Sequence, residues 1–126
     1  MSAEETVNEF IRRIVNKDID GACELVADDV EYDNVPMGKN IGPDGIKAFL
    51  SPMVDGLDEV QFVVHRQTVS ANVVMNERTD RFRLGDAWMD LPVMGVFEVN
   101  DVDRITLWRD YFDMATMTDQ IAKLAP

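Results

Sequence analysis

A regular alternation of side-chain types over residues 72–84 most constrains how this chain folds. Successive side chains of a β-strand point to opposite faces, so residues two apart share a face. The odd positions over 77–83 are polar and typical of a solvated face. The even positions carry Arg78 and Asp80 together with apolar side chains. The pattern therefore predicts a strand whose buried face holds an ion pair.

This ion pair is expected to need a third member. A buried charge must be paired, because an isolated one costs several kcal/mol or changes its protonation state. Residues two apart rarely form an ideal two-pronged pair, so Arg78 and Asp80 are expected to recruit a carboxylate from another strand. Asp110 is the natural candidate, since it shares a strand face with Trp108 and Phe112. The alternative is a structural ion-pair network without a catalytic role.

A third pair two residues apart, Tyr32 and Asn34, lies in the predicted strand 30–35. Hydrogen-bonded core groups are the alternative interpretation of this pair, and ordinary core packing is the alternative for Trp108. Taken together, the three pairs predict one pocket that holds two carboxylates, a guanidinium, a phenol, an amide and an indole. Such a set can perform acid–base chemistry without a metal or a histidine.

Helical patterns occupy the first part of the chain and strand patterns most of the rest. Ser2 and Glu5 predict a capping box for the first helix, which continues as one apolar stripe to Val15. A short second helix is expected within 18–29, and a third helix begins at Gly42. Further strands are predicted at 60–70, 72–84, 93–100 and 105–112, and a closing helix at 116–124.

Helices followed by a run of long strands indicate an α+β protein. The length fits one domain over residues 1–126. A curved, mixed or antiparallel sheet packed on about three N-terminal helices makes a cone whose open end is a natural small-molecule pocket. The order of elements resembles the cystatin-like cone of nuclear-transport-factor-2-like (NTF2-like) and SnoaL-like proteins. That fold hosts several activities, so it does not decide the function.

The charge balance excludes several classes of partner. With 24 acidic and 12 basic residues the formal charge is −12, whereas nucleic acids and anionic membranes require basic surfaces. Cys23 is the only cysteine, so no intrachain disulfide is expected. Residues 1–10 lack the pattern of a signal peptide, and no apolar stretch reaches the roughly 20 residues of a membrane span. We therefore expect a cytoplasmic protein.

The sequence contains no motif for nucleophilic, metal-dependent or cofactor-dependent catalysis. His65 is the sole histidine and has no nucleophile motif beside it, so a surface or hydrogen-bonded role is expected. Cys23 is expected to be a small core residue. No His/Cys cluster has metal-ligand spacing and no glycine-rich phosphate loop occurs, so neither a metal nor a cofactor is expected. Trp88 fits a surface or an interface equally well.

Four segments resemble the limonene-1,2-epoxide hydrolase family. They are Tyr32-Asp33-Asn34, Asn76-Glu77-Arg78-Thr79-Asp80, Gly95-Val96-Phe97 and Trp108-Arg109-Asp110-Tyr111-Phe112-Asp113. Their order and strand context match, and the resemblance extends from the first helix to about residue 114. It implies a one-step attack of water on a small hydrophobic epoxide, without a covalent intermediate and without a cofactor.

The resemblance also implies roles for individual residues. Asp110 looks like the general base, and Tyr32 and Asn34 help it to hold the water. Asp80 looks like the general acid, with Arg78 bridging the two carboxylates. The expected pocket residues are Trp108, Met37, Met75, Phe82, Leu84 and Phe112. Relatives of this type are commonly homodimers, so a homodimer is expected.

The sequence leaves open two other functions for a protein with this fold. A ketosteroid-isomerase-like or polyketide-cyclase-like enzyme would use one aspartate beside an oxyanion site and would not need an arginine joining two acids. A non-catalytic module would bind a hydrophobic ligand passively, and its buried charges would then tolerate apolar replacement.

Overall fold

The computed structural model describes residues 1–124, which form four helices and one sheet. The first helix, α1, spans Ala3–Val15. Its capping box is confirmed, because Ser2 Oγ accepts the Glu5 N–H and Glu5 Oε1 accepts the Ser2 N–H, each at 3.0 Å. The apolar stripe of α1 is buried against the sheet through Val7, Phe10 and Ile14.

The second helix, α2, is shorter than the sequence indicates and covers only Ile19–Cys23. Asp18 caps it by accepting the Gly21 N–H at 2.9 Å. The predicted continuation towards residue 29 is wrong, because the chain enters the sheet at Val26, which is paired with Ile105. The local helical pattern cannot reveal a partner that lies about 80 residues further along the chain.

Six strands form one mixed sheet in the order β2-β1-β6-β5-β4-β3. They are β1 (Val26–Asn34), β2 (Gly38–Ile41), β3 (Glu59–Ser70), β4 (Val73–Leu84), β5 (Ala87–Val99) and β6 (Ile105–Tyr111). Neighbouring strands are antiparallel except β1 and β6, which are parallel. The prediction of a curved mixed sheet is confirmed, although no strand was predicted at the position of β2.

Strand β5 begins six residues before its predicted start at Val93. The sequence hides this part because Pro92 interrupts the strand pattern. In the structure Pro92 pairs with Thr79 of β4, and the pairing of β5 with β6 begins only at Met94. Proline is tolerated there because β5 has a neighbour on one side only at that position.

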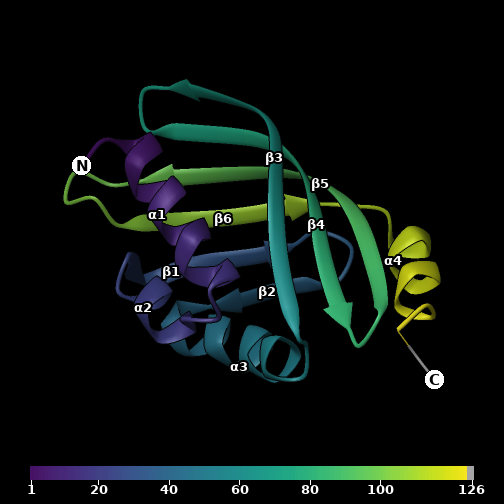
Figure 1. Cartoon of the computed structure of the whole chain (residues 1–126). Coiled ribbons are helices and arrows are strands. Elements are labelled where there is room, and N and C mark those ends of the chain that lie inside the picture. The colour runs from purple at the N-terminus through teal and green to yellow at the C-terminus, as the bar shows by residue number, and fades with distance from the viewer. Residues whose placement is uncertain (125–126) are drawn as a thin grey trace.

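The third helix, α3, spans Gly42–Asp55 and buries Ile46, Leu50 and Val54. Figure 1 shows α1, α2 and α3 on the side of the sheet towards which the long strands β3 and β4 curl. The fourth helix, α4, spans Met114–Ile121 and packs beside β5, far from the amino terminus (Figure 1). No helix within residues 1–124 is long and apolar enough to cross a membrane.

Candidate active site

Strand register brings the predicted polar residues into one place. Asn34 of β1 lies beside Asp110 of β6, Asp110 lies beside Gly95 of β5, and Gly95 lies beside Asn76 of β4. Paired residues on neighbouring strands face the same side of a sheet. The four residues therefore form one row across the concave face, and Arg78 lies two residues beyond Asn76 on that same face.

Arg78 holds Asp80 with two hydrogen bonds. Its Nε donates to Asp80 Oδ1 at 2.9 Å and its Nη2 donates to Asp80 Oδ2 at 3.1 Å. The expectation that neighbours two apart would pair poorly is wrong, because the guanidinium reaches both oxygens of the Asp80 carboxylate. Arg78 is 1% exposed and Asp80 is 5% exposed, so this is a buried, charge-assisted pair.

Asp110 completes the predicted triad from the other side. Its Oδ2 accepts a hydrogen bond from Arg78 Nη2 at 2.9 Å, and its Oδ1 accepts one from Trp108 Nε1 at 3.0 Å. The guanidinium thus bridges both carboxylates. The indole fixes the orientation of Asp110, and it is itself held by edge-on contact with Phe10 of α1.

Burial raises the pKa of Asp80. Loss of water is the largest cause and the negative charge of Asp110 adds to it, so the pKa of Asp80 rises to about 6 in spite of the attraction of Arg78. A carboxyl group with this pKa can carry a proton near neutral pH. Asp80 can therefore serve as an acid beside a second carboxyl group, that of Asp110.

Tyr32 and Asn34 lie next to this pair on β1. The Tyr32 ring stacks on Trp108 with ring centres 4.1 Å apart. Burial raises the pKa of the Tyr32 phenol well above its ordinary value, so the phenol keeps its proton. Asn34 Nδ2 is buried and has no hydrogen-bond partner among residues 1–124. Both side chains therefore have a donor group to offer to a molecule in the cavity.

A cavity of about 260 Å³ opens above these groups. Its polar lining consists of Tyr32, Asn34, Asp80 and Asp110, whereas Arg78 lies behind the two carboxylates and does not line it. The remaining wall is apolar and includes Phe49, Met53, Phe62, Leu91, Met117 and Ile121. One polar end in an otherwise apolar cavity is the usual form of a site for a small hydrophobic molecule.

Four of the six predicted pocket residues line this cavity, namely Met37, Phe82, Trp108 and Phe112. Met75 and Leu84 do not, which corrects the prediction. Met75 occupies an odd position of β4 and is exposed on the opposite face. Leu84 has the correct parity but ends the strand, where the sheet is no longer covered, and it is 40% exposed.

Gly95 is a functional residue to which the sequence analysis assigned no role. A Cβ atom at this position would lie 2.3 Å from Arg78 Nη1 and 3.0 Å from Asp110 Oδ1. Only glycine therefore leaves room for the guanidinium to cross β5 and reach β6. The signal was a glycine in the interior of a strand, which often marks close approach by another group.

Replacing Gly95 with alanine should displace Arg78. We expect Gly95→Ala to lower the free energy of unfolding by about 1–3 kcal/mol through overpacking, and to lower the activity proposed below at least tenfold. Gly56→Ala is the control, because its Cβ would meet only Pro52 O and Met53 O, at ordinary distances of 3.5 and 3.7 Å. Urea denaturation and rate measurements check both variants, and unchanged values for Gly95→Ala would contradict this role.

The remaining candidates lie away from the cavity. Cys23 is buried, and burial raises the pKa of its thiol to about 11, which suits the expected core role. His65 is exposed and contacts Thr79 Oγ1 at 2.8 Å. Trp88 stacks beneath the guanidinium of Arg81, which lies 4.2 Å from the ring centre. Within residues 1–124, no group of three His, Cys, Asp or Glu side chains is arranged to hold a metal.

The curved sheet and the covering helices define an NTF2-like cone, and two carboxylates joined by an arginine lie at the polar end of its cavity. Solved structures agree on this fold. A putative SnoaL-like polyketide cyclase from Shewanella denitrificans has a TM-score of 0.84 at 18% identity, covering 95% of this chain and 96% of its own. At that identity the likeness concerns the fold alone.

Sequence comparison narrows the class. The chain matches the limonene-1,2-epoxide hydrolase catalytic domain over residues 1–123. Epoxide hydrolase EphG of Mycobacterium tuberculosis is 36% identical over 111 residues, which are 88% of this chain and 73% of EphG. The structure of an LEH-like epoxide hydrolase from M. tuberculosis has a TM-score of 0.82 at 34% identity, covering 97% of this chain and 91% of that one. The chain belongs to the limonene-1,2-epoxide hydrolase family of enzymes.

Proposed function

We propose that the protein adds water to a small hydrophobic epoxide in one step and releases a vicinal diol. One observation carries this proposal: a single buried guanidinium joins two carboxylates at the polar end of an apolar cavity. An isomerase with one acidic group would not need the bridge. Epoxide opening needs both a base and an acid at the same moment, and the bridged pair offers both.

Asp110 is the proposed base. Bulk water has a pKa of about 15.7 and is a poor nucleophile until a base removes a proton. Asp110 takes that proton while the water oxygen bonds to an epoxide carbon. Asn34 Nδ2 donates a hydrogen bond to the water and the Tyr32 hydroxyl oxygen accepts one from its second hydrogen, so one lone pair of the water oxygen remains directed at the substrate.

Asp80 is the proposed acid. As the carbon–oxygen bond of the epoxide breaks, the departing oxygen takes the proton of Asp80 and becomes the second hydroxyl of the diol. Asp80 is then ionised and Asp110 protonated, and proton exchange through the diol or solvent restores the starting state. Arg78 contacts both carboxylates throughout, so negative charge that moves from one to the other stays compensated.

The cavity defines the substrate class. Its apolar wall favours an uncharged hydrocarbon frame, and its volume of about 260 Å³ suits a small molecule. The net charge of −12 opposes anionic substrates. The proposed substrate is therefore a small, neutral, hydrophobic epoxide bound with its oxygen towards Asp80.

Isotope labelling tests the reaction type. Epoxides of increasing size are incubated with the protein in ¹⁸O-labelled water, and the diols are analysed by mass spectrometry after a single turnover. Direct attack by water places the label in the diol in the first turnover, whereas a covalent enzyme ester would supply an unlabelled enzyme oxygen. No diol from any epoxide, combined with isomerisation of an enone, would favour the isomerase reading instead.

The rate should fall as pH rises. The proposed mechanism needs Asp80 protonated, and burial raises the pKa of Asp80 to about 6. Above this value each pH unit removes the proton from about nine-tenths of the remaining active form, so kcat/KM should fall about tenfold per unit. A pH profile of kcat/KM between pH 5 and 9 checks this, and a rate that rises through pH 6–8 would contradict it.

We also propose that the protein is a cytoplasmic homodimer. Family membership supports the dimer, and so do the exposed apolar side chains Val63, Met75 and Met94 on the outer face of the sheet. Light scattering on the purified protein tests the oligomeric state, and cell fractionation tests the location.

A further inference from the structure

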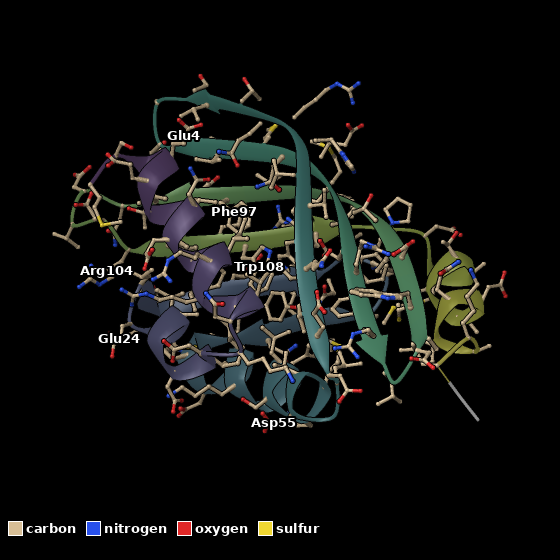
Figure 2. The ribbon with its side chains drawn as sticks, viewed as in Figure 1. Glu4, Glu24, Asp55, Phe97, Arg104 and Trp108 are labelled. Carbon is tan, nitrogen blue, oxygen red and sulfur yellow. The ribbon has the colours of Figure 1, made fainter. Side chains whose placement is uncertain are left out.

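A chain of hydrogen bonds leads from the surface of α1 to the buried guanidinium. Gln67 Nε2 donates to Glu4 Oε2 and to Asn8 Oδ1, each at 3.0 Å. Asn76 Nδ2 donates to Gln67 Oε1 at 3.1 Å. Arg78 Nη1 donates to Asn76 Oδ1 at 2.9 Å. Figure 2 labels Glu4 at the outer end of this chain, on α1.

The two ends fix the direction of every bond between them. An ionised carboxylate such as Glu4 only accepts hydrogen bonds, and a guanidinium only donates them. The amides of Gln67 and Asn76 must therefore both turn their NH2 groups outwards and their oxygens inwards. Flipping either amide would place donor against donor or acceptor against acceptor at each of its contacts.

We propose that Asn76, oriented by Gln67, is a positioning residue that holds Arg78 in the plane where it bridges Asp80 and Asp110. Asn76 is fully buried and is not part of the cavity wall, so it does not contact the substrate. It acts through Arg78. This inference rests on the proposed function where its tests measure the rate of epoxide opening.

A neutral amide suits this position better than a carboxylate. The titratable or charged groups facing Asp80 are Arg78 on its own strand, Asp110 on β6 and Tyr32 on β1. The side chains that β3, β5, α3 and α4 turn towards the cavity are uncharged, including Phe62, Leu91, Phe49 and Met117. A third carboxylate at position 76 would compete for Arg78 and repel negative charge on the pair.

Steady-state kinetics test the positioning role. Asn76→Ala removes the acceptor for Arg78 Nη1, and we expect kcat to fall about 10- to 100-fold with KM unchanged, since misplaced groups slow the reaction without weakening binding. Gln67→Leu should give a smaller fall in the same direction. Asn72→Ala is the matched control, because Asn72 Nδ2 donates to Val99 O at 3.2 Å, away from the site. It should leave kcat and KM unchanged.

Carboxyl titration provides a test that needs no substrate. NMR of protein labelled with ¹³C in the aspartate carboxyls follows Asp80 and Asp110, with Asp80→Asn for assignment. Asn76→Ala, which removes the acceptor of Arg78 Nη1 without adding charge, should move the titration of Asp80 to higher pH, because a displaced guanidinium stabilises the ionised carboxylate less. Asn72→Ala should leave it in place.

The outcomes separate the two proposals. If the wild type opens no epoxide but Asn76→Ala still shifts the titration of Asp80, the proposed function fails and the positioning role stands. The positioning role is overturned if Asn76→Ala and Gln67→Leu lower only the melting temperature, while kcat and the titration of Asp80 match those of the wild type.

Discussion

Replacing Asp110 with asparagine is expected to abolish epoxide hydrolysis while leaving the fold in place. Asparagine has the same shape, and its oxygen can still accept one of the hydrogen bonds from Trp108 and Arg78. It cannot take a proton from water. Because general base catalysis contributes about 10²–10⁴-fold, kcat should fall by at least that factor. The rate of diol formation and thermal unfolding followed by circular dichroism measure the two effects.

Asp80→Asn should have an effect of the same size for the opposite reason, because an amide does not give a proton to the departing oxygen. Asp33→Asn is the matched control. Asp33 is also a buried aspartate beside the triad strands, but it pairs with Arg109 Nε at 2.9 Å on the other face of the sheet. The control should keep its activity. Substantial turnover by either the Asp80 or the Asp110 variant would contradict the catalytic roles proposed for these two residues.

The sequence predicts the shared face of the site because strand alternation is a local property. Arg78 and Asp80 are two residues apart, as are Trp108 and Asp110, and such pairs share a face whatever the rest of the fold does. The contact between Arg78 and Asp110 was an inference from the need to pair buried charges. The structure shows that contact, with 2.9 Å between Arg78 Nη2 and Asp110 Oδ2.

The parts that the sequence does not predict depend on partners distant in the chain. Val26 belongs to a strand because β1 pairs with β6 in parallel. Residues 38–41 form the strand β2 by pairing with the other edge of β1. The row of Asn34, Asp110 and Gly95 requires the register of three strands. No local pattern contains that register, so a glycine inside a strand signals a close approach but does not identify Arg78 as the approaching group.

The pocket errors have a simpler origin. Methionine suits apolar cavities, which favoured Met75, but its odd position on β4 already placed it on the outer face. Leu84 shows the limit of parity, since a strand face is buried only where other elements cover it. Alternation predicts the face of the sheet to which a side chain points. Only the tertiary fold determines whether other elements cover that face.

Replacing Arg78 with leucine is expected to cost more stability than any other single change in the site. It leaves Asp80 and Asp110 buried without their shared cation. Breaking a buried ion pair by removing one partner costs about 3–5 kcal/mol, so the free energy of unfolding should fall by that amount at pH 7.5. Activity should be lost as well, because nothing then separates the acid from the base.

This loss should shrink as the pH is lowered. Without Arg78 the folded state holds a proton on Asp80 more tightly than the unfolded chain does, because burial and the charge of Asp110 raise the pKa of Asp80 and no cation opposes them. Between the unfolded and the folded pKa values the folded state binds more protons, so its stability rises as pH falls. Urea denaturation at pH 7.5 and 5.5 measures this recovery.

Arg109→Leu is the control for this recovery. Arg109 also bridges two carboxylates, those of Glu31 and Asp33, but its side chain is 29% exposed on the outer face. Partly solvated pairs contribute roughly 1 kcal/mol or less, so this variant should lose little stability and should show a much weaker dependence on pH. A loss for Arg78→Leu that grows on acidification, or that merely equals the loss for Arg109→Leu, would mean that the buried triad is not held by its central charge.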